Sequence, residues 1–148
     1  MIKGKGLVVL AGRSRYSLDL VSNALVEWGY DVIRAQTSLD LFRVAAQCGL
    51  SLVVADLTTL GLPAPSLLEG LDQFSPGVPV ILLHDYPTLN EALAALKSGA
   101  EDFLSQPIDY ERLKFVVESS LRRSYRSFPD HEAGNDEFPD VSSTFRFR

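Results

Sequence analysis

The sequence predicts an α/β fold, a (βα)5 domain with a doubly wound, parallel five-stranded sheet, and two observations support this prediction. Apolar runs of strand length recur at residues 6–10, 31–35, 51–55, 79–83 and, more weakly, 102–104. Segments with helical periodicity lie between them. The first, third and fourth runs are apolar at nearly every position, which is typical of central strands covered by helices on both faces.

The helical segments begin and end at recognisable signals. Ser38 is expected to cap a helix over residues 38–49. Thr88, followed three residues later by Glu91, forms a capping-box pattern at the start of residues 88–99. Further helices are expected over 17–29, 66–74 and 108–123. Strands that alternate with helices in this way imply right-handed crossovers and a three-layer domain.

Composition narrows the class of function. A chain of 148 residues is large enough to bury a core as one domain. Its single cysteine, Cys48, and its two histidines, His84 and His131, provide no disulfide framework and no zinc-ligand spacing. The formal net charge of −5 argues against nucleic-acid binding, and the apolar run near the N-terminus is too short for a signal peptide or a membrane span. We therefore expect a cytoplasmic protein whose partner is another protein.

Asp56 stands out because it ends the third apolar run, in the stretch SLVVADLTTLGLP. In doubly wound sheets, chemistry is found outside the carboxyl ends of the strands. Asp56 is therefore a candidate functional residue. The alternative is a structural role, in which the carboxylate caps a turn or pairs with a nearby arginine.

The predicted domain covers residues 1–123, and residues 124–148 differ from it in character. This segment contains two Phe-Pro pairs, few aliphatic residues and a cluster of acids. Its composition is typical of a disordered tail. However, its phenylalanines and the alternating end TFRFR leave open a segment that docks elsewhere.

Four stretches of the sequence resemble the receiver domain of two-component response regulators, a chemotaxis-regulator-like (βα)5 family with the flavodoxin-like strand order 2-1-3-4-5. These are EWGYDVIRA, SLVVADLTTLGLP, PVILLHDY and ALKSGAEDFLSQPID. The resemblance implies that Asp56 occupies the position of the phosphoryl acceptor and that Phe103 occupies the aromatic switch position. It also implies that Mg²⁺ is held by acids near the acceptor.

The chain departs from this family pattern at several pocket positions. The acidic pair expected after the first strand is missing, because no acid occurs between Met1 and Leu18, and Arg13 and Arg15 lie there instead. The family's lysine is matched by Gln106 and its strand-end hydroxyl by His84. With Thr58, these residues are expected to line the pocket. A guanidinium from Arg13 or Arg15 is then expected to pair with Asp56, and the Gln106-Pro107 bond is expected to be cis.

These features indicate a single-domain response regulator that acts by protein-protein interaction and is not an enzyme. We expect no cofactor, with Mg²⁺ bound weakly if at all, and no contact with nucleic acid or membrane. The partner would be a histidine kinase, a downstream effector or a second copy bound through residues 88–121. Two alternatives remain: a receiver still phosphorylated at Asp56 by a histidine kinase, and a flavodoxin-like cofactor-binding protein, although AGRSRYS is a faint match to a phosphate-binding loop. A nucleophile elbow, which a small hydrolase would need, does not occur.

Overall fold

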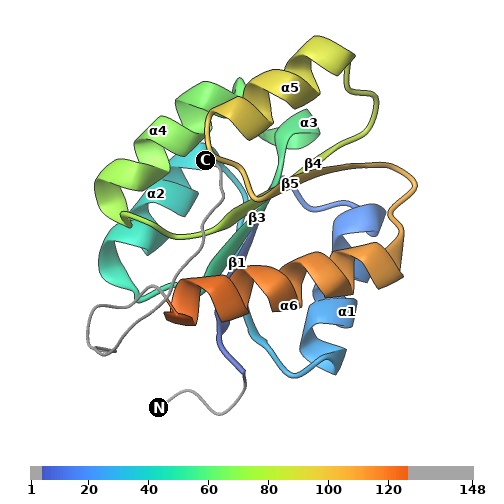
Figure 1. The fold of residues 1–148 in the computed structure, drawn as a ribbon. Coiled ribbons are helices and arrows are strands. Elements are labelled where there is room, and N and C mark those ends of the chain that lie inside the picture. Colours follow the sequence, from blue (N-terminus) through green and yellow to red (C-terminus); the bar gives the residue numbers. More distant parts are fainter. Residues whose placement is uncertain (1–4, 127–148) are drawn as a thin grey trace.

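The computed structural model describes residues 5–126, which form a parallel sheet with helices on both faces (Figure 1). The strand order is β2-β1-β3-β4-β5, so the predicted fold and order are confirmed. The strands are β1 (Leu7–Ala11), β2 (Asp31–Ala35), β3 (Leu52–Asp56), β4 (Val80–His84) and β5 (Asp102–Ser105). Strands β1, β3 and β4 each lie one residue later than the apolar runs that predicted them.

The helices occupy the segments predicted for them, with one addition. They are α1 (Tyr16–Glu27), α2 (Ser38–Gln47), α3 (Leu57–Leu60), α4 (Ala64–Phe74), α5 (Leu89–Lys97) and α6 (Tyr110–Arg126). The addition is α3, a single helical turn directly after Asp56. Helix α6 continues past residue 123, where the domain was expected to end. Residues 127–148, the rest of the expected tail, lie outside the described residues.

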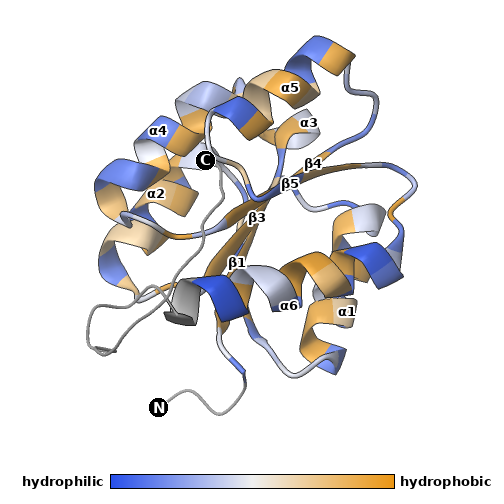
Figure 2. Ribbon diagram, viewed as in Figure 1, coloured by the Kyte–Doolittle hydropathy of each residue, from blue (hydrophilic) through white to orange (hydrophobic). Residues whose placement is uncertain are grey.

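Alternate residues of the central strands face opposite sides of the sheet and build two separate cores. Val9, Val53 and Leu82 belong to the core beneath α2, α4 and α5. Val8, Val54 and Ile81 belong to the core beneath α1 and α6. Figure 2 shows the resulting hydrophobic colour of the inner strands. Because helices cover both faces of the sheet, polar side chains can gather where the strands end and the loops begin.

The start of α2 corrects one prediction. The N-cap is Thr37 and not Ser38, because Thr37 has the extended backbone of a cap and its hydroxyl oxygen accepts a hydrogen bond from the Asp40 N–H at 3.0 Å. Ser38 is already helical. The capping box of α5 is confirmed, since Thr88 and Glu91 make both reciprocal hydrogen bonds.

Among the helices described here, none has the length and hydrophobicity that a membrane span requires.

Candidate functional site at the carboxyl edge of the sheet

Asp56 is buried at the carboxyl end of β3, between the ends of β1 and β4. Its side chain is 1% exposed. Ala55 pairs with Ala11 of β1, and Asp56 pairs with Leu83 of β4. The loops that follow β1 and β4 therefore both reach the Asp56 carboxylate, as the topology predicts.

Arg15, which directly precedes α1, joins Asp56 to a second carboxylate. Its Nη2 donates to Asp56 Oδ2 at 2.9 Å and its Nε to the same oxygen at 3.2 Å. Its Nη1 and Nη2 also donate to Asp85 Oδ2 and Oδ1, at 2.9 and 2.8 Å. We call this group of Arg15, Asp56 and Asp85 the arginine clamp. It confirms the expected guanidinium beside Asp56 and identifies Arg15 as its source.

The fork geometry gives the clamp its strength. A planar guanidinium donates two parallel hydrogen bonds to Asp85, an arrangement stronger and more specific than a single charged contact. The hydrogen bonds from Arg15 hold the pKa of the Asp85 carboxyl below its ordinary value, against a smaller opposing effect of burial. The same contact with Asp85 raises the pKa of Arg15 above its already high ordinary value, so the guanidinium is charged at neutral pH.

Two threonines of α3 complete the local network. Thr59 donates its hydroxyl proton to Asp56 Oδ2 at 2.8 Å, and its oxygen accepts the backbone N–H of Arg13 at 2.9 Å. Thr58, one of the expected pocket residues, accepts the backbone N–H of Asp85 at 2.9 Å. These bonds connect the loops after β1, β3 and β4. Arg13 contributes through its backbone, while its side chain is exposed.

The other oxygen of Asp56, Oδ1, is buried and has no hydrogen-bond partner among the described residues. Both strong donors, Arg15 and Thr59, address Oδ2. An unpaired buried carboxylate oxygen carries a desolvation cost. The hydrogen bonds of the arginine clamp therefore offset most of the cost of burying the Asp56 carboxylate.

Gly12 allows the loop after β1 to pass close to Asp56. Its φ is +150°, a conformation that side chains with a Cβ rarely adopt. A Cβ at this position would lie 2.9 Å from both Asp56 Cβ and Thr59 Oγ1, and 2.7 Å from Leu18 Cδ1. Only glycine fits here without displacing the carboxylate or the helix behind it.

The remaining expected pocket residues lie at the same edge but make other contacts. The His84 ring stacks on Phe103, with centroids 6.2 Å apart, and its Nδ1 accepts the Tyr86 N–H at 3.2 Å. Gln106 donates its backbone N–H to the His84 carbonyl at 3.2 Å. The Gln106-Pro107 bond is cis, as expected. His84 and Phe103 thus form a pair on the α5 side of the sheet.

A Mg²⁺ ion at this site would compete with Arg15 for the carboxylates. Proteins hold this cation through oxygen ligands, usually one or two carboxylates together with water, and no group of three or more potential metal-binding side chains occurs in residues 5–126. The two carboxylates that do meet, those of Asp56 and Asp85, are bridged by the positive charge of Arg15. A cation would have to displace the guanidinium from both.

Asp85 and Thr59 belong to the candidate site but were not predicted from the sequence. The resemblance to the receiver family places His84, and not Asp85, at the pocket position that ends the fourth strand. Asp85 follows that strand directly, beside the strand that ends at Asp56. Two neighbouring buried strands that each end at an acid predict that the two carboxylates lie close together. The arginines after the first strand strengthen this prediction, because they can pair with both acids.

Comparison with known proteins identifies the family. The response regulator receiver domain family matches residues 8–118. The chain belongs to this family. The receiver is 30% identical over 94 residues to the transcriptional regulatory protein ZraR of Klebsiella oxytoca, covering 64% of this chain and 21% of that protein. It is 29% identical over 107 residues to GlrR of Escherichia coli, covering 72% and 24%.

Solved receiver domains share the fold. The signal receiver domain of a putative LuxO repressor protein from Vibrio parahaemolyticus superposes with a TM-score of 0.76 at 25% identity, covering 88% of this chain and 98% of that one. A receiver domain from Methanospirillum hungatei gives 0.75 at 20% identity, covering 83% and 98%. The receiver spans less than a third of the curated relatives quoted above, so their full activities do not transfer to it. Receivers are signalling domains.

Proposed function

We propose that this receiver acts in two-component signalling by binding a protein partner, without the conventional Mg²⁺-dependent phosphorylation of Asp56. The arginine clamp is the observation that carries this proposal. Arg15 supplies a fixed positive charge where a phosphoryl group and its cation would have to enter, and it engages both available carboxylates. On this proposal the protein is not an enzyme, needs no cofactor and works in the cytoplasm.

The chemistry of phosphoryl transfer explains why the clamp would prevent it. An aspartate acts as a nucleophile when a cation neutralises charge on both the carboxylate and the phosphoryl oxygens. Here Asp56 Oδ2 already accepts three hydrogen bonds, from two Arg15 nitrogens and from Thr59. Gln106 replaces the family's lysine and carries no charge. The alternative, a receiver still phosphorylated at Asp56 by a histidine kinase, would require the guanidinium to leave.

The test uses a beryllofluoride and Mg²⁺ titration of the full chain, followed by amide chemical shifts of Asp56 and Asp85. We expect no saturable shift at millimolar Mg²⁺, with or without beryllofluoride. The matched sample is Arg15→Ala, which removes the guanidinium and leaves both acids in place. Saturable shifts in the wild-type chain, or a phosphorylated species by intact mass after incubation with a small phosphodonor, would establish the alternative.

We further propose that the partner binds the surface formed by α5, β5 and α6, within residues 88–121. Helix α5 exposes three leucines at positions i, i+4 and i+7: Leu89 is 74% exposed, Leu93 47% and Leu96 44%. Such a stripe on the solvent side of a helix is a typical docking feature. Asp102 and Glu101 near it are already paired with Arg112 and Arg123, so the leucines are the stronger anchors.

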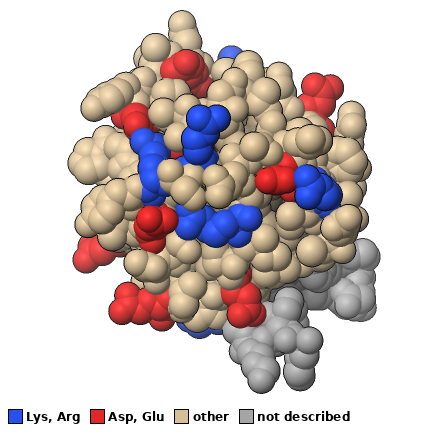
Figure 3. All heavy atoms as spheres, turned by 180° about the vertical axis from the view of Figure 1, so that it is seen from behind, with Lys and Arg blue, Asp and Glu red and all other residues tan. Residues whose placement is uncertain are grey.

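On the face seen in Figure 3, basic side chains lie beside acidic ones and form no broad basic surface, which favours a protein over a nucleic acid. Self-association is measured first, by sedimentation equilibrium. If a second copy is the partner, Leu93→Ser should weaken the dimer tenfold or more, while Leu39→Ser, at a leucine on α2 that is 70% exposed, should not. Arg112→Glu should weaken it about tenfold and Asp56→Asn should leave it unchanged.

The same variants apply to a histidine kinase or an effector when the wild-type chain is monomeric. Loss of binding in Asp56→Asn but not in Leu93→Ser would show that Asp56 still operates a switch. It would also show that the α5 leucines are not the docking surface. The family match already favours a receiver over the flavodoxin-like alternative.

A further inference from the structure

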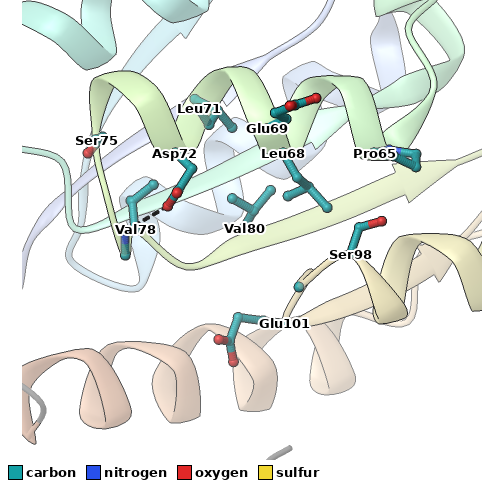
Figure 4. Close-up of a pocket in the computed structure, with 12 residues that line it drawn as sticks. Pro65, Leu68, Glu69, Leu71, Asp72, Ser75, Val78, Val80, Ser98 and Glu101 are labelled. Atoms are coloured by element: carbon teal, nitrogen blue, oxygen red, sulfur yellow. Dashed lines mark hydrogen bonds between the residues drawn. The ribbon is translucent and has the colours of Figure 1, made fainter. Parts of the chain in front are cut away.

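A groove of about 530 Å³ runs along one side of α4, away from the arginine clamp (Figure 4). It lies between this helix, the start of β4 and the turn that joins α5 to β5. Its volume is within the range of ligand-binding pockets. Neither the clamp nor the leucine stripe of α5 contributes a residue to it.

The groove combines an apolar floor with an acidic rim. The floor is formed by Leu68, Leu71, Val78 and Val80, of which all but Val78 are buried, and the rim by Glu69 and Asp72, while Glu101 also lines the groove but is paired with Arg123. No lysine or arginine is among its lining residues. Glu69 and Asp72 are exposed. The chemistry that fits this groove is therefore an apolar group flanked by positive charge.

One segment of this chain outside the described residues has that chemistry. Residues 145–148 read Phe-Arg-Phe-Arg, and the rest of the chain after Arg126 is acidic, with five acids and no other arginine or lysine. In an extended strand, alternate side chains point to opposite sides. The two phenylalanines would therefore share one side and the two arginines the other.

The groove is also within reach of this segment. Arg123, near the end of α6, forms an ion pair with Glu101, which lines the groove. The last turn of α6 therefore lies beside the groove. About 20 residues separate Arg126 from Phe145, which span up to roughly 60 Å when extended. A tether of this length gives an effective concentration on the order of millimolar, so even weak contacts hold the segment in place.

We propose that residues 144–148 bind the α4 groove of their own chain. Phe145 and Phe147 pack on the apolar floor, and Arg146 and Arg148 lie beside Glu69 and Asp72. This inference does not rest on the arginine clamp, because it involves neither Asp56 nor Arg15, although the groove shares Ser98, Gly99 and Glu101 with the range proposed for the partner surface. It assigns the tail a docking site instead of a free, solvated state.

Methyl and amide spectra of the full chain provide the first test. Replacing Phe145 and Phe147 by serine should shift the methyl signals of Leu68, Val78 and Val80. Phe138→Ser, a matched change in the same tail, should leave them in place. Unchanged signals in the double variant would overturn the proposal. These variants change no residue of the helices and strands described here, so they are expected to fold.

Charge reversal provides a second test. Arg146→Glu with Arg148→Glu should release the segment, as should Glu69→Arg with Asp72→Arg. Combining all four changes should restore the wild-type position of the Val80 signals. Release by one set without restoration by the combination would refute the assigned charge pairing.

A spin label separates binding within one chain from binding between chains. In a Cys48→Ser background, a nitroxide on Ser143→Cys should broaden the amide signals of Leu68 and Val80. The effect should persist when labelled chains are diluted with excess unlabelled protein. A second sample mixes isotope-labelled chains that carry no nitroxide with nitroxide-labelled chains that carry no isotope. Broadening in this sample would mean that the groove receives the tail of a second copy, contrary to the proposal.

Discussion

Removing Arg15 is the sharpest test of how the site is built. Asp56 is 1% exposed with Arg15 in place, and Arg15→Ala removes both guanidinium bonds and leaves one hydroxyl contact, from Thr59. Breaking a fully buried ion pair from one side costs about 3 to 5 kcal/mol, and breaking an exposed pair costs about 0.2 to 1 kcal/mol. Arg15 itself is 29% exposed, so water can enter where it stood. We therefore expect a loss of about 2 kcal/mol in the free energy of unfolding.

Urea denaturation at pH 7 measures this loss, and a double-mutant cycle assigns it. Asp56→Asn alone should cost less, because Arg15 keeps its contacts with Asp85. The double variant should cost less than the sum of the single changes by about 1 kcal/mol or more. Arg43→Ala, which breaks the exposed pair with Asp40, is the control and should cost at most about 0.5 kcal/mol. An Arg15→Ala cost no larger than this control would refute the idea that the clamp compensates Asp56.

Three other predictions follow from the structure. Gly12→Ala should destabilise the domain by about 2 to 4 kcal/mol, from strain and overlap, whereas Gly49→Ala, with open space around it, should be close to neutral; equal effects in urea melts would contradict the close approach at Gly12. The folded-state pKa of Asp85 lies below its ordinary 3.8, so its contribution should be present above about pH 4 and fade at lower pH. The difference in the free energy of unfolding between wild type and Asp85→Asn should therefore shrink as the pH falls from 6 to 3. A difference that grows would contradict the lowered pKa of Asp85. Thr88→Ala should cost about 1 kcal/mol by removing the cap of α5, and unchanged hydrogen exchange in the first turn of that helix would argue against it.

The fold was predictable because its signals are local. Three apolar runs, at Val8, Val53 and Ile81, are buried on both sides of the sheet, and this requirement appears directly in their composition. The capping box of α5 is likewise written in two residues three positions apart. The errors in the predicted strands and helix caps are small. Three strands lie one residue later than predicted, and the cap of α2 is Thr37 instead of Ser38.

The candidate site was only partly predictable, because it is assembled by contacts distant in sequence. The pairing of Arg15 with Asp56 follows from the reversal of charge after the first strand. The choice of Arg15 over Arg13 depends on how the chain turns at Gly12, and a φ of +150° leaves no mark beyond the glycine itself. The second acceptor, Asp85, is 70 residues from Arg15 and meets it through the sheet register. Contacts between residues so far apart in the sequence become visible only in the three-dimensional structure.

The arginine clamp has a consequence for how the pocket responds to its surroundings. Metal ions exchange with the medium, and their occupancy rises and falls with concentration or with an added chelator. The positive charge of Arg15 is covalently part of the chain, only 41 residues from the carboxylate it serves. Its local concentration is therefore set by the fold and does not depend on the solution, so this site should show the same charge balance in EDTA as in millimolar magnesium. A change in the pocket then requires the Arg15 side chain, or the backbone between Gly12 and Arg15, to move.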